Sequence, residues 1–258
     1  MARRTYWIVS VTVLLLLLMF GLWRSASLQV TTAPLPSAQD SLKTPARHPM
    51  DGEEFVGSTV CLECHAEITR AYQLSPMGNS TSAAITASVC EDYQQTNSFD
   101  SGHGLQFRVD RTADGISHHE ISKSGDEVLY DHHVEVQWAI GSGKQGRSYA
   151  FESDGMLLQS PISWYSQRKL WDLSPGFAGE MPNRFGRRVV DGCVACHIGR
   201  TNPEPGASDR FQQPVVLEAA IGCERCHGPA GAHVRWRRSS VPNDHPDPIV
   251  NPRKLPIN

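Results

Sequence analysis

The order of apolar and polar positions gives the chain a hydrophobic start. Tyr6–Trp23 is an uncharged, largely apolar run that follows Arg3 and Arg4. As a helix it would be about 27 Å long at about 1.5 Å per residue, and a bilayer core is about 30 Å thick. Residues 1–24 are therefore predicted to be a signal anchor that exports the rest of the chain. The alternative is a signal peptide cleaved at the small residues 25–27.

A polar tether and a mixed body are predicted to follow. Residues 25–54 are rich in Pro, Ser, Thr and Ala and show no apolar period, which is typical of a flexible linker. Alternating apolar and polar positions within residues 101–175 predict antiparallel strands separated by glycine turns. The predicted strands are Leu105–Asp110, Ile116–Ile121, Val134–Ile140, Ser148–Phe151 and Met156–Gln159.

One short helix is predicted over Ala66–Leu74, where apolar residues recur at helical spacing. The expected fold class is therefore α+β. A central antiparallel β segment is accompanied by short helices and loops in a domain over residues 55–258, which ends in a cysteine-rich segment over residues 185–258.

Composition and charge exclude several classes. The chain has 258 residues, 40% of them hydrophobic and 20% charged, and its net charge is −3. That length allows one or two domains with a real core. The composition argues against a disordered polymer or a multi-span membrane protein. The absence of a basic balance argues against a nucleic-acid partner.

The cysteines carry the chemistry, because six of the seven lie in three copies of C-x-x-C-H. This pattern is the attachment signature of c-type haem, in which two thiols bond the porphyrin and the histidine binds the iron. We expect three covalent haems, attached through Cys61, Cys64, Cys193, Cys196, Cys223 and Cys226, with His65, His197 and His227 as proximal ligands. A zinc ribbon or three disulfides would leave the three histidines unexplained. The seventh cysteine, Cys90, is expected to be a small buried hydrophobe.

The second axial ligands are harder to predict. His233 follows a turn expected at Gly228, Pro229 and Gly231, which would aim its imidazole at a neighbouring iron. Met77 follows the predicted helix on a polar turn and is the second candidate. His197 has no candidate nearby, so its haem is the candidate for an open position if one of the three haems is five-coordinate.

The chain resembles a large family of exported multihaem c-type cytochromes, tetrahaem-like proteins often fused to tetratricopeptide repeats. The resemblance covers roughly residues 55–252. Family members usually continue to a further haem motif and helical repeats, whereas this sequence stops at Asn258. The segments that carry the resemblance are Cys61-Leu-Glu-Cys-His-Ala-Glu-Ile, Ser75-Pro-Met-Gly-Asn-Ser, Ser160-Pro-Ile-Ser-Trp-Tyr, Trp171-Asp-Leu-Ser-Pro-Gly and Ile221-Gly-Cys-Glu-Arg-Cys-His-Gly-Pro.

This resemblance implies an electron carrier and favours Met77 and His233 as axial ligands. Together with the export signal it predicts a membrane-tethered electron-transfer protein on the extracytoplasmic side, with redox proteins as partners. The alternatives are a haem enzyme or a haem-based redox or gas sensor. The enzyme would have one five-coordinate haem acting on a small nitrogen or oxygen species, and only then would a small-molecule substrate be expected.

Overall fold

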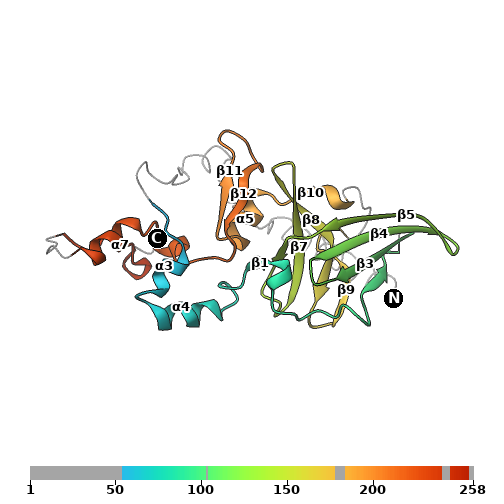
Figure 1. Ribbon diagram of the computed structural model, residues 1–258, viewed down its shortest axis with the longest axis horizontal. Coiled ribbons are helices and arrows are strands. Elements are labelled where there is room, and N and C mark those ends of the chain that lie inside the picture. Colours follow the sequence, from blue (N-terminus) through green and yellow to red (C-terminus); the bar gives the residue numbers. More distant parts are fainter. Residues whose placement is uncertain (1–53, 103, 178–183, 240–244, 256–258) are drawn as a thin grey trace, which may run out of the picture. The chain divides into compact units, whose positions relative to one another are not determined.

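The computed structural model describes residues 54–102, 104–177, 184–239 and 245–255, and residues 51–258 form one compact unit. The unit is rich in strands and has few, short helices, so the expected α+β class is confirmed (Figure 1). The helices are α3 (Ser58–Leu62), α4 (Ala66–Gln73), α5 (Asp191–His197), α6 (Glu224–His227) and α7 (Gly231–Arg238), with 3₁₀ turns η1 (Ala84–Thr86), η2 (Arg184–Gly186) and η3 (Pro252–Lys254).

The strands form three antiparallel sheets. A six-stranded sheet has the order β1-β6-β7-β8-β10, with β9 also paired to β8; a four-stranded sheet has the order β2-β3-β4-β5; and β11 pairs with β12. The strands are β1 (Thr81–Ala83), β2 (Ser98–Asp100), β3 (Leu105–Arg111), β4 (Ile116–Ser124), β5 (Glu127–Glu135), β6 (Trp138–Ile140), β7 (Gly146–Ser153), β8 (Met156–Tyr165), β9 (Leu170–Leu173), β10 (Arg187–Arg188), β11 (Arg200–Pro203) and β12 (Phe211–Glu218).

The main core joins the two larger sheets. Alternate residues of β3, Phe107 and Val109, point into it, as does Ile116 of β4. They meet Ile162 and Trp164 of β8, and all five side chains are almost fully buried. This burial follows from the period of two in a strand, which sends one set of side chains inward and the other toward solvent.

The predicted strands at Leu105, Ile116, Ser148 and Met156 are confirmed. The single predicted strand Val134–Ile140 is wrong, because β5 ends at Glu135 and β6 begins at Trp138 in the other sheet. Val136 lies in this crossover, is buried and donates its N–H to the Ile116 carbonyl at 2.9 Å. The apolar alternation continues through the crossover, and so it could not reveal the change of sheet.

A second core lies between the hairpin β11–β12 and the strands β7 and β8. Ala150 and Leu157 of the sheet pack with Ile198, Phe211 and Val215, and all five are buried. Ile198 directly follows α5. This packing therefore fixes α5, which carries the second C-x-x-C-H motif, to the β structure.

Within the described part of the chain, no helix is long and apolar enough to cross a membrane. The predicted anchor over residues 1–24 lies outside the described residues, and so does the tether over residues 25–54 apart from Glu54.

Candidate functional site

The first C-x-x-C-H motif occupies the junction of two short helices. Cys61 lies in α3, Cys64 follows in a turn, and His65 is the residue directly before α4. The N–H of His65 donates to the Cys61 carbonyl at 2.8 Å, which closes one helical turn. Because residues three and four apart lie on one side of such a turn, both thiols and the imidazole share one side of the chain.

The other two motifs are also helical. Cys193, Cys196 and His197 lie in α5, whereas Cys223 precedes α6 and Cys226 and His227 lie within it. These two motifs together supply six cysteines and histidines. All of them except Cys223 are exposed, namely Cys193, Cys196, His197, Cys226 and His227. Exposure on short helices leaves these groups accessible for covalent attachment of a cofactor.

A buried carboxylate joins the first motif to the third. Glu224, the residue after Cys223, is 4% exposed and accepts N–H bonds from Val56, Gly57 and Ala230 at 2.7–3.2 Å. These bonds satisfy both carboxylate oxygens, as burial of a charged group requires. The third motif is thereby bonded to the chain segment directly before α3.

A second set of bonds reinforces this junction. Glu218 accepts from the N–H and the hydroxyl of Ser58, and the Ser58 hydroxyl oxygen accepts the Cys223 N–H at 3.0 Å. A Cβ on Gly222 would lie within 2.6 Å of Glu218 and Ser58 side-chain atoms, so a larger residue there would displace these two side chains. Burial, followed by the neighbouring Cys223 thiol, raises the pKa of the Cys61 thiol to about 11.

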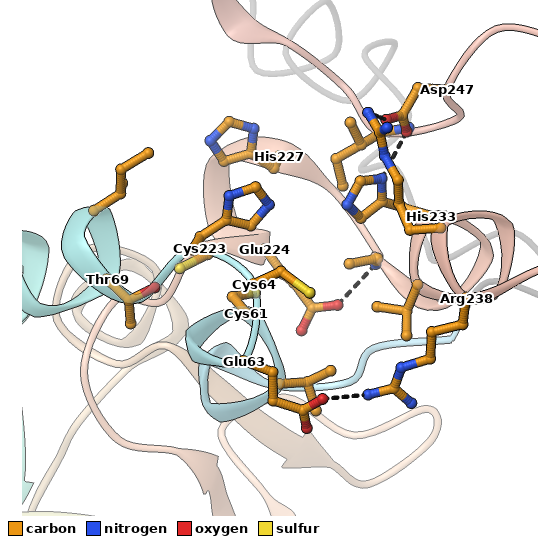
Figure 2. A pocket seen from close by; sticks show the side chains of 17 residues that line it. Cys61, Glu63, Cys64, Thr69, Cys223, Glu224, His227, His233, Arg238 and Asp247 are labelled. Atoms are coloured by element: carbon orange, nitrogen blue, oxygen red, sulfur yellow. Dashed lines mark hydrogen bonds and ion pairs between the residues drawn. The ribbon is translucent and has the colours of Figure 1, made fainter.

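A cavity of about 650 Å³ opens between these two motifs (Figure 2). That volume lies within the range of about 300–1,000 Å³ that is usual for small-molecule and cofactor sites. Apolar side chains line much of the wall, and motif residues project into it. The lining includes Val60, Ile68, Val234 and Ile249 together with Cys61, Cys64, His65, Cys223, His227 and His233.

The imidazoles of His65 and His233 face each other in this cavity. Their ring centroids are 6.4 Å apart and the ring planes differ by 20°. If one metal ion were bound between the two rings, the centroid separation would be the sum of two metal–nitrogen bonds of about 2.0 Å and the two distances from ring nitrogen to ring centroid. That sum is about 6 Å. The pair therefore fits an iron between the rings, and the thiols of Cys61 and Cys64 line the same cavity.

His233 reaches this position on a helix and not on a turn. The chain does leave the helical path at Gly228, which follows α6 with a φ of 74°, but it re-enters a helix before His233. Gly231 is the first residue of α7, and His233 lies in its first turn. The Gly231 N–H donates to the Glu54 carbonyl at 2.9 Å. Proline and glycine are compatible with a helix start, where N–H groups have no partner within the helix.

Both histidines near the third motif have a partner for one ring nitrogen. The Nδ1 of His233 lies 2.6 Å from Oδ1 of Asp247, and the Nδ1 of His227 lies 2.8 Å from the Val250 carbonyl oxygen. Partial burial alone would raise the pKa of the Asp247 carboxyl. Hydrogen bonds from His233, the Ile249 N–H and Arg237 outweigh this effect, so the pKa is lowered. A metal-binding histidine commonly donates its other ring N–H to such a carboxylate or carbonyl.

The second motif stands apart from the cavity lining. The His197 carbonyl accepts from the Thr81 hydroxyl at 2.8 Å, and Arg225 of the third motif donates to the Ala195 carbonyl at 2.6 Å. The short sequence gap between the second and third motifs predicts that they lie close together, and the Arg225 contact does join them. Among the described residues, no ring stacks against His197.

Two further residues considered in the sequence analysis, Met77 and Cys90, lie outside the cavity lining. Met77 is 53% exposed on the turn after α4 and does not line the cavity, so its role as a ligand stays a prediction. Cys90 is exposed rather than buried, which corrects the expectation of a small buried hydrophobe. Its thiol is nevertheless partly desolvated and lies beside Glu91, and both effects raise its pKa.

Two residues of the site escape prediction from the sequence. Glu224 lies inside a motif, but its burial depends on a segment 168 residues away. Asp247 lies in a proline-rich tail that carries no periodic signal. The only signal for Asp247 is its charge, and Asp244 in the same stretch carries the same charge, so this signal is weak.

Comparison with known proteins agrees with the motifs. The family model described as cytochrome c554 and c-prime matches residues 180–228, which contain the second and third motifs. A solved structure, that of the outer cell wall cytochrome OcwA, is similar at 17% identity and a TM-score of 0.43. The match covers 74% of this chain and 35% of that one, so this chain spans about a third of its length. The family match and the motifs together support an electron-transfer protein with covalently bound c-type haem.

Proposed function

We propose that this protein transfers electrons through three covalently attached c-type haems, one at each C-x-x-C-H motif. Each haem, when bound, supplies an iron that is oxidised and reduced by one electron. The cysteines at each motif hold the porphyrin, and His65, His197 and His227 serve as proximal ligands.

The opposed imidazoles of His65 and His233 carry this proposal. Their centroid distance of 6.4 Å suits one iron held between two histidines. An iron with both axial positions filled by protein has no open site for substrate, which favours electron transfer over catalysis at this haem. The Nδ1 contacts of His233 and His227 leave the other ring nitrogen of each histidine to bind metal.

The proposal includes a location and partners. The apolar segment over residues 1–24 would hold the protein at the membrane with its folded body outside the cytoplasm. Covalent haem attachment also takes place outside the cytoplasm, so the two expectations agree. Redox proteins would be the donor and acceptor. Met77 is proposed as an axial ligand to another of the haems.

The test uses the full chain, expressed in a host that matures c-type haem. Intact mass under denaturing conditions should show an increment of three haems. His233→Ala should open one iron, which then binds carbon monoxide. His132→Ala is the matched control, because His132 is an exposed histidine of β5 and does not line the cavity. A lower haem number, or no new carbon monoxide binding in His233→Ala, would refute the proposal.

The alternative is an enzyme with an open coordination position at the His197 haem. The observation that favours it is that no described ring stacks against His197. Carbon monoxide binding to the unaltered protein, lost when His197 is replaced, would support this alternative. A protein that binds no carbon monoxide would exclude it.

A further inference from the structure

Two residues near the end of the described chain contact two of the proposed iron ligands. Asp247 accepts from His233, and the Val250 carbonyl accepts from His227. Figure 2 shows Asp247 joined to His233, with His227 at the other side of the cavity. One short segment therefore contacts the ring of a histidine from each of two sites, but with different acceptors.

We propose that Asp247 is a positioning residue that makes the His233-ligated haem a weaker oxidant than the His227-ligated haem. The inference rests on the proposed function and adds to it the direction of electron transfer between two haems. Electrons would pass from the haem between His65 and His233 to the haem of His227.

The segment is held in place on several sides. Asp247 is 22% exposed in its side chain, and the Ile249 N–H donates to its Oδ1 at 3.2 Å. Arg237 of α7 donates to its Oδ2 at 2.8 Å. The Val250 N–H donates to the His227 carbonyl at 3.2 Å, so this residue both donates to and accepts from His227. These bonds fix which acceptor each imidazole meets.

The chemical difference between the two acceptors determines which haem has the lower reduction potential. A hydrogen bond to an ionised carboxylate is roughly twice as strong as one between neutral groups. Asp247 therefore draws the Nδ1 proton of His233 more strongly than the Val250 carbonyl draws that of His227. A more anionic imidazole is a stronger donor to iron through its other nitrogen. Stronger donation stabilises the oxidised iron and lowers the reduction potential of that haem.

Arg237 provides a control for the sign of the change in reduction potential. Its guanidinium pairs with the Asp247 oxygen that does not contact His233, and so it withdraws part of the negative charge. Loss of Arg237 should make the carboxylate a stronger acceptor. The two residues are therefore predicted to act on the same haem in opposite directions.

The experiment is a redox titration of the full, haem-loaded chain, followed by optical and electron paramagnetic resonance spectra. Asp247→Asn keeps the size of the side chain and removes its charge. It should raise the potential of one haem and leave the other two unchanged, with all three haems still present by mass. Arg237→Gln should lower the potential of that same haem. Arg168→Gln, on an exposed ion pair of the β structure, is the matched control and should shift none.

A merely structural role for Asp247 predicts a different result. Unchanged potentials in Asp247→Asn, or equal shifts of all three haems, would overturn the inference. If Asp247→Asn does not retain three haems, Arg237→Gln decides alone, and an unchanged potential would refute the inference. The outcome is separate from the test of function, because carbon monoxide binding in His233→Ala reports ligation without reference to Asp247.

Discussion

Glu224 shows how one residue can hold two distant motifs together. Its carboxylate is buried and accepts N–H bonds from Val56, Gly57 and Ala230. Glu224→Gln would turn an amide N–H₂ toward these donors, and unsatisfied buried groups cost roughly 1–3 kcal/mol each. We expect the variant to lose roughly that much stability in denaturant unfolding of the haem-loaded protein.

The control for Glu224 is Glu67, an exposed acid in the first turn of α4. Glu67→Gln should change the free energy of unfolding by about 0.5 kcal/mol or less. Equal effects of the two substitutions would contradict the structural role given to Glu224.

His118 predicts a pH dependence of stability. It is fully buried between the sheets, its Nδ1 lies 2.7 Å from the Ser160 hydroxyl, and burial lowers its pKa from 6.5 to about 3. The unfolded chain therefore binds more protons than the folded chain between those values. The contribution of His118 to stability is present above about pH 6.5 and is lost as the pH falls toward about 3.

The measurement is denaturant unfolding at several pH values for the unaltered protein and for His118→Gln. The free energy of unfolding should fall less steeply below pH 6.5 in the variant, because glutamine does not titrate. Parallel pH profiles would show that His118 is not the titrating group.

At the scale of elements, a buried ion pair fixes β7 to the loop before β2. Arg147 and Glu91 are 2.6 Å apart, with side chains 6% and 0% exposed, and the Tyr149 hydroxyl also donates to Glu91. Burial alone would raise the pKa of Glu91, but these two partners lower it on balance. Breaking a buried pair leaves one uncompensated charge and typically costs about 3–5 kcal/mol.

Arg147→Met should therefore lower the free energy of unfolding by about 3–5 kcal/mol at neutral pH. The matched control is Arg168→Met, whose ion pair with Asp172 is largely exposed. An exposed pair contributes about 0–1 kcal/mol. Chemical denaturation monitored by circular dichroism distinguishes the two, and similar small losses in both would contradict the assigned role of Arg147.

The elements differ in how far the sequence predicts them. The alternation of apolar and polar residues predicted most strands of the central segment. The helix predicted after His65 agrees with α4 to within one residue. The change of sheet at Val136 escaped prediction, because this buried residue continues the apolar alternation from Val134 to Trp138 without a break. The motif cysteines and histidines were evident from local spacing. The pairing of His65 with His233 depends on packing between segments far apart in the chain, which local spacing does not encode.

At the scale of the molecule, the three motifs are not equivalent. The first and third share one cavity and the bonds of Glu218 and Glu224. The second is fixed to the β structure through Ile198 and the Thr81 contact. Changes at the second motif should therefore disturb the first haem less than changes at the third motif.

Double variants test this arrangement. Cys193→Ala with Cys196→Ala should reduce the haem number by one and leave the potential of the His65 haem unchanged. Cys223→Ala with Cys226→Ala should also remove one haem but shift that potential, because Cys223 lies beside Cys61. Intact mass and redox titration provide the readouts. Equal shifts in both double variants would contradict the division into a shared cavity and a separate site.

The bond from Ser58 to Glu218 joins residues 160 positions apart, and this separation has a consequence for biogenesis. A chain exported from its N-terminus presents Cys61 and Cys64 to the attachment machinery long before His233 arrives. The cysteines of the first motif would then be available for attachment before the segment that carries His233 has been exported. Native ligation would come last, when the two distant segments meet, and that slow long-range closure would set the pace of maturation.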